Sequence, residues 1–108
     1  MEKFDEKLYL KEMYRDDYFP NFLVDKVKAT LAEVVEFLES GERDIPKIQE
    51  KFDIATVKIN DLQKEFWAKD SEIETAARDD IGITVGKILD HFGLDDYDVE
   101  DAIMERDW

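Results

Sequence analysis

One apolar stripe constrains the fold of this chain more than any other feature of its sequence. It steps alternately by three and four residues through Ile45, Ile48, Phe52, Ala55, Ile59, Leu62 and Phe66. This spacing places all of its members on one face of a helix, because an α-helix turns once every 3.6 residues. Asp44 suits the N-cap of that helix, and Pro46 suits its first turn. The stripe therefore predicts a long amphipathic helix that begins after Asp44.

A second stripe predicts a partner helix immediately before the first one. Its members also step by three and four residues: Val24, Val27, Leu31, Val34 and Leu38. Pro20 and Asn21 are typical of a helix start, and Gly41 is typical of the position just after a helix end. The connection through residues 40–43 is short, so we expect the two helices to pack as antiparallel neighbours.

A third long helix is predicted between Ser71 and Gly93. The segment Ser71–Glu74 matches a capping box, in which serine and glutamate side chains satisfy the free amides of a helix start. The apolar stripe of this helix comprises Ile73, Ala77, Ile81, Thr84, Val85, Ile88 and Phe92. Gly82 and Gly86 lie roughly opposite the stripe. They predict either the close approach of another backbone or a bend, unless their cost of up to about 1 kcal/mol each is simply tolerated.

The two ends of the chain predict shorter helices. Phe4, Leu8 and Met13, with Tyr9 and Tyr14, indicate a short N-terminal helix. Asp98 is the expected N-cap of a final helix in which Val99, Ala102 and Ile103 point inward. Alternating strand patterns, hairpin signals, repeats and linkers are lacking. We therefore expect a single all-α domain over residues 1–108, a compact bundle of three long amphipathic helices closed by short terminal helices.

The charge of the chain is unevenly distributed. There are 29 Asp and Glu against 15 Lys and Arg, which gives a net charge of −14. Residues 1–69 carry −4 of this charge and residues 70–108 carry −10. Such an acidic chain is not expected to bind nucleic acid directly or an anionic membrane surface, since positive charge supplies that attraction. The remaining partners are cationic or neutral.

The sequence also predicts a cellular location. Acids occur from position 2, so the start does not have the uninterrupted apolar stretch of a signal peptide. The apolar runs are two to four residues long, whereas a membrane span needs about 20. With no cysteine, there is no disulfide framework. We expect a cytoplasmic protein.

Catalytic and metal-binding patterns are weak. The single histidine, His91, lies at the edge of an apolar stripe, and both serines, Ser40 and Ser71, sit at helix boundaries. An alternating series of acids (Asp96, Asp98, Glu100, with Asp107 at the twelfth position) resembles a calcium loop, but Asp101 replaces its essential glycine. We therefore expect no enzyme activity, no cofactor and no dedicated metal site.

The aromatic residues leave two interpretations open. Tyr9, Tyr14, Tyr18, Phe19 and Phe22 cluster around the start of the first long helix. They either pack the N-terminal segment onto the bundle or form an exposed patch that anchors a partner. The same alternatives apply to Trp67, which lies off its stripe, and to Trp108.

Three segments resemble a known protein family. They are Tyr9–Pro20, Ser71–Arg78 and Arg106–Trp108, and the likeness extends over almost the whole chain. The family consists of small, acidic, uncharacterised bacterial proteins and is catalogued as a domain of unknown function. The resemblance implies a stand-alone bacterial cytosolic protein and brings no activity or cofactor. In size and charge alone, the chain is also similar to bacterial immunity and antitoxin-like inhibitors.

These observations lead to a first hypothesis, a non-catalytic protein-binding module whose acidic C-terminal third docks on a basic partner protein. The residues expected to bind are six acids and one aromatic anchor: Asp79, Asp80, Asp95, Asp96, Asp98, Asp101 and Trp108. The alternative is a homo-oligomeric structural protein, with a dimer formed through the regular stripes or the face of Trp67. A carboxylate metal protein or enzyme is the least favoured hypothesis.

Overall fold

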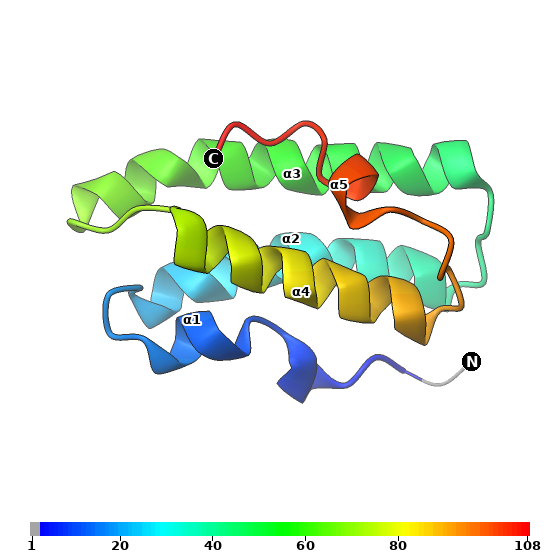
Figure 1. The fold of residues 1–108 in the computed structure, drawn as a ribbon, viewed down its shortest axis with the longest axis horizontal. Helices are drawn as coiled ribbons and strands as arrows, with labels where there is room; N and C mark the ends of the chain where they lie inside the picture. Colours follow the sequence, from blue (N-terminus) through cyan, green and yellow to red (C-terminus); the bar gives the residue numbers. More distant parts are fainter. Residues whose placement is uncertain (1–2) are drawn as a thin grey trace.

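Two antiparallel helices form the centre of the molecule in the computed structural model, which describes residues 3–108. Helices α2 (Asn21–Glu39) and α3 (Ile45–Ala68) lie side by side and are joined by a short loop (Figure 1). The predicted stripe of α2 is buried throughout, and that of α3 is buried except at Ile45. Ile45 is 50% exposed because it occupies the first position of α3, at the end of the bundle. The predicted hairpin is otherwise confirmed.

Helix α4 (Thr75–His91) shares one hydrophobic core with this hairpin, and every member of its predicted stripe is buried. The predicted start at Ser71 is wrong. The Ser71 amide donates to the Phe66 carbonyl at 2.9 Å, and the Asp70 amide donates to the Trp67 carbonyl at 3.1 Å. With Asp70 at φ 58°, these bonds form a Schellman motif that closes α3. The Ser71 amide therefore belongs to the end of α3, and α4 begins four residues later.

The N-terminal segment contains two short helical turns, η1 (Glu6–Leu8) and α1 (Lys11–Arg15), where a single helix was predicted. Leu10 separates them because its backbone is left-handed, at φ 48°. Leu10 also occupies the N-cap of α1, and its side chain offers no acceptor. Helix α4 supplies one instead: Asp80 Oδ2 accepts from the Met13 amide at 2.8 Å, and Thr84 Oγ1 accepts from the Leu10 amide at 3.0 Å.

Helix α5 (Val99–Ala102) begins as predicted, with Asp98 Oδ1 accepting from the Glu100 amide at 2.9 Å. Its Val99 side chain lies beside the two glycines of α4. A Cβ atom at Gly86 would lie 3.6 Å from Val99 Cγ2, and one at Gly82 would lie 4.0 Å from Val99 Cγ1. Both are ordinary van der Waals distances, so alanine would fit at either position. The predicted close approach of another backbone is therefore not found, and the neighbour is a side chain of α5.

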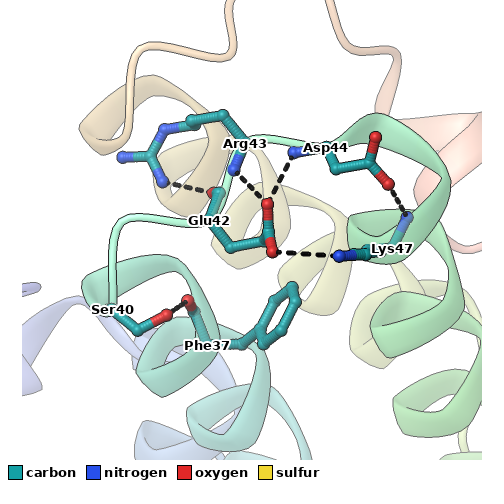
Figure 2. A network of polar contacts seen from close by, with 6 residues as sticks. All are labelled: Phe37, Ser40, Glu42, Arg43, Asp44 and Lys47. Atoms are coloured by element: carbon teal, nitrogen blue, oxygen red, sulfur yellow. Dashed lines mark hydrogen bonds and ion pairs between the residues drawn. The ribbon is translucent and has the colours of Figure 1, made fainter.

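The loop between α2 and α3 is organised by one carboxylate, that of Glu42 (Figure 2). Glu42 Oε2 accepts from the backbone amides of Arg43 and Asp44, both at 3.1 Å. Lys47 Nζ lies 3.7 Å from Glu42 Oε1. These contacts, led by the Asp44 amide, lower the pKa of Glu42. Asp44 is the predicted N-cap, and its Oδ2 accepts from the Lys47 amide at 3.4 Å. Glu42 thus directs the chain into the first turn of α3.

Two substitutions of Asp80 should distinguish how much its hydrogen bond and its charge each contribute to the free energy of unfolding. Asp80→Ala leaves the buried Met13 amide without its acceptor, so we expect the free energy of unfolding to fall by about 1–3 kcal/mol. Asp80→Asn keeps an acceptor oxygen and removes a buried charge, so the loss should stay below about 1 kcal/mol at neutral pH. Denaturant unfolding measures both values. Equal losses in the two variants would contradict the proposed capping role.

The same pair of variants predicts a pH dependence. Burial raises the pKa of Asp80, because desolvation disfavours its charged form more than the Met13 amide favours it. The folded chain therefore holds this proton more tightly than the unfolded chain. As the pH rises from the ordinary aspartate range towards neutrality, the natural chain should lose stability relative to Asp80→Asn. Unfolding curves recorded from pH 4 to pH 7 test this sign.

Replacement of Glu42 by glutamine should have the opposite pH dependence. The pKa of Glu42 is lowered in the folded chain, so its charge stabilises the fold above the ordinary glutamate range, and this contribution is lost as the pH falls through the folded pKa. Glu42→Gln should therefore be less stable than the natural chain at pH 7 and approach it in acid. Thermal unfolding as a function of pH measures the difference. Glu50→Gln, on the exposed side of α3, controls for the change in net charge.

Candidate functional site

An open hollow of about 550 Å³ lies where the start of α3 meets the connector between α4 and α5. Its apolar lining comes from Ile45, Pro46, Leu94 and Tyr97. Its acidic lining consists of Asp96, Asp98 and Asp101, and the residues that line it include no base. We call this feature the acidic hollow. It brings together three of the six acids that the sequence analysis selected.

The three carboxylates of the acidic hollow differ in what they already bind. The Asp98 carboxylate accepts a hydrogen bond from the Glu100 amide at the start of α5, so it also stabilises the first turn of that helix. All three are exposed, and neither Asp96 nor Asp101 forms an ion pair with another residue of the described chain. Their negative charges are therefore uncompensated and face solvent. An approaching cation would meet both of them beside an apolar surface.

The wall of the acidic hollow is held in place by Gln49 of α3. The Tyr97 hydroxyl donates to Gln49 Oε1, while Gln49 Nε2 donates to Asp53 Oδ1 and to the Asp101 carbonyl, each at 2.9 Å. Burial, aided by the charges of Asp53 and Asp101, raises the pKa of Tyr97 to about 12. Tyr97 therefore remains a protonated donor at neutral pH. One amide side chain thus links the α4–α5 connector and α5 to α3.

The segment after α5 runs along α3 and ends on the core (Figure 1). Asn60 Nδ2 donates to the Glu105 carbonyl at 2.9 Å, and Asn60 Oδ1 accepts from the Asp107 amide at 3.0 Å. Trp108, at the end of this segment, is only 8% exposed. The prediction that Trp108 anchors a partner is therefore corrected, because its ring packs inside this molecule and fastens the C-terminal segment to the bundle.

The remaining predicted acids lie elsewhere. Asp95 is exposed on the α4–α5 connector, next to Asp96. Asp79 lines a different hollow of about 610 Å³, between α1 and α4. Asp80 is 4% exposed, and its carboxylate accepts a hydrogen bond from the Met13 amide. It does not present its charge at the surface, so it is removed from the set of candidate binding residues. The last 39 residues are therefore acidic without forming one continuous acidic surface.

The aromatic cluster around the start of α2 contains both buried side chains, which pack against the bundle, and exposed ones, which a partner could contact. Tyr9 and Phe19 are buried and Tyr14 is half-buried, as expected of side chains that pack the N-terminal segment onto the bundle. Tyr18 and Phe22 are 41% and 49% exposed, where α2 begins. Trp67 is 53% exposed near the end of α3. Of the two tryptophans, only Trp67 has a side chain that a partner can reach.

Two other chemical possibilities can be placed on the structure. His91 is half-buried between aromatic rings, with centroid distances of 5.5 Å to Phe4 and 4.8 Å to Phe92. Within residues 3–108, no group of three or more His, Asp or Glu side chains is arranged to hold a metal ion. Over the same residues, no helix combines the length and the apolar character that crossing a membrane requires.

Sequence reasoning missed the apolar half of the acidic hollow. Ile45 was assigned to the core stripe, although it lies in the first turn of α3, where the neighbouring helix no longer covers it. Leu94 and Tyr97 stand three residues apart among acids, and this spacing was a usable signal for one apolar surface. Gln49 had no signal of its own, because its role depends on where the distant residues Tyr97 and Asp101 fold.

Comparison with known proteins identifies the family but not an activity. No curated protein and no solved structure matches the chain significantly. A family model described as a family of unknown function (DUF5713) matches residues 3–108, which is nearly the entire chain. The chain therefore belongs to this family of unknown function.

Proposed function

We propose that this protein is a non-catalytic, cytoplasmic binding module that docks on a basic partner protein through the acidic hollow. One observation carries the proposal: three exposed acids, which the charge distribution selected from the sequence, line a single hollow together with an exposed apolar surface. The partner class is a protein with exposed lysine or arginine. A role as an inhibitor of a basic bacterial protein, similar to immunity or antitoxin-like proteins, fits this chemistry.

Lysine and arginine side chains match both parts of the hollow. Each has a flexible apolar stem that ends in a cationic head. The stem can pack against Ile45 and Leu94, while the head approaches the carboxylates of Asp96 and Asp101. A purely apolar side chain would leave these charges desolvated and unpaired, which is unfavourable. The combination of linings therefore favours a basic side chain over an apolar one.

The charge of the chain adds a kinetic advantage to this contact. A net charge of −14 attracts a basic protein over distances comparable to the Debye length, about 10 Å at 0.1 M salt. Such steering raises the rate of association more than it lowers the rate of dissociation. The apolar lining then supplies contacts that salt does not screen. Binding should consequently weaken with salt without disappearing abruptly.

Affinity capture from the native lysate tests this proposal. The natural chain is immobilised, proteins are captured at 50 mM and 500 mM salt, and the captured proteins are identified by mass spectrometry and purified. We expect a basic protein that is retained at low salt and captured in a clearly smaller amount at high salt. Titration of that purified protein should then give an affinity about three- to tenfold lower for Asp96→Asn/Asp101→Asn than for the natural chain.

A matched control separates the hollow from the overall charge. Asp61→Asn/Glu72→Gln removes the same number of charges from exposed positions outside the hollow. It should change the affinity by less than twofold. Equal losses for the two double variants would show that net charge, and not the acidic hollow, determines binding. Capture that does not respond to salt would contradict the proposal as a whole.

A further inference from the structure

One long face of the molecule carries charges of both signs. It lies on the outer side of the α2–α3 hairpin and is defined here by Lys26 and Glu33 of α2 and by Ile54, Val57, Lys58 and Glu65 of α3. We call it the hairpin face. Its two lysines and two glutamates balance, in a chain whose net charge is −14. Ile54 and Val57 are 41% and 45% exposed, so α3 also carries apolar surface on its outer side.

The charges of the hairpin face are arranged as opposed pairs across its two helices. Lys26 Nζ lies 2.6 Å from Glu65 Oε1, and Lys58 Nζ lies 2.8 Å from Glu33 Oε2. The order of the charges reverses between the pairs, since the base is on α2 in the first and on α3 in the second. A groove of about 570 Å³, lined in part by Val34, Phe37 and Ile54, runs beside the second pair.

This arrangement is complementary to itself under two-fold symmetry. A two-fold axis that lies in the face, parallel to the helices, places α2 of one copy over α3 of the other at the same level. Glu33 of each copy then meets Lys58 of the other, and each Lys26 meets Glu65. A two-fold axis across the helices would instead place α2 over α2, and midway between the pairs it would oppose Lys26 to Glu33 and Lys58 to Glu65. The charges therefore permit both arrangements, and mixing charge-reversed variants distinguishes them. Both contacts are isologous, which is the commonest basis of protein dimers.

We propose that the hairpin face is a homodimer interface, occupied by a second copy of this chain. The net charge of the molecule opposes association through its acidic surfaces, so copies approach through the hairpin face. Its length is set by α2, whose 19 residues span about 28 Å at 1.5 Å per residue, and two adjacent helices are about 20 Å wide. This gives about 560 Å² per partner, or about 1,100 Å² in total, which exceeds the roughly 1,000 Å² that a specific interface needs. The apolar contacts of Ile54 and Val57 lie within the contact area.

Charge reversal provides a test that uses the intact chain. Sedimentation velocity of the natural chain over a concentration series should show a monomer–dimer equilibrium. Lys58→Glu makes all four charges around the axis negative, and Glu33→Lys makes all four positive. Each single variant should therefore bind itself at least tenfold more weakly. Because the Glu33–Lys58 pair is exposed, both variants should keep the helical circular dichroism and melting temperature of the natural chain closely.

Mixing the two single variants is the decisive measurement. In a mixed dimer, the two glutamates of Lys58→Glu face the two lysines of Glu33→Lys, so a heterodimer should form where neither variant dimerises alone. A loss of folding in one variant could not be repaired by adding the other. Lys11→Glu, on α1, makes the same change in net charge away from the hairpin face and should leave the dimer intact.

Three outcomes would overturn the assignment. They are a natural chain that stays monomeric at the highest concentration, a dimer that survives Lys58→Glu unchanged, and a mixture of variants that stays monomeric. If the natural chain stays monomeric, the hairpin face either binds nothing or binds a different protein. These outcomes are independent of the acidic hollow, because none of the substituted residues lines it.

Discussion

The packing of α2 against α3 is the contact on which the rest of this molecule depends. Both stripes bury branched and aromatic side chains, among them Leu31, Leu38, Phe52 and Ile59, each at most 1% exposed. Complete burial of one such side chain contributes about 1.5–3 kcal/mol. These contacts are close along the chain because the connecting loop is short. The hairpin therefore provides the surface onto which α4, α1 and α5 pack.

The terminal segments bury apolar side chains such as Met13 and Trp108 and are also attached by hydrogen bonds from side chains to distant backbone groups. Asp80 and Thr84 of α4 accept hydrogen bonds from the backbone amides of Met13 and Leu10, respectively. The Asn60 side chain of α3 forms hydrogen bonds with the Glu105 carbonyl and the Asp107 amide. The two bonds from the N-terminal segment to α4 are buried, and a buried amide that loses its partner is costly, so they determine where that segment lies. The bundle thus combines an apolar hairpin with polar side chains that contact the two ends.

These polar contacts also shape the candidate site. Gln49 joins Tyr97 to α3 and binds the carbonyl of Asp101, which places two acids of the hollow beside Ile45. The proposed dimer would use a different kind of surface, with paired charges of both signs and the exposed side chains of Ile54 and Val57. A dimer of this form would leave both acidic hollows accessible, because the residues that line the hollow are separate from those of the hairpin face. One assembly could then present two docking sites.

The sequence alone determined the helices, their buried faces and the hairpin, because helical periodicity is a local property that the order of residues records directly. It also located the excess of negative charge after residue 69. It failed where a residue had two local interpretations, as with Ser71, whose amide closes α3 although its side chain suits a cap for α4. Only the tertiary structure decided which charges are exposed. It buried Asp80 and Trp108, and it collected Asp96, Asp98 and Asp101 in one hollow, because exposure depends on contacts between segments that are distant in the chain.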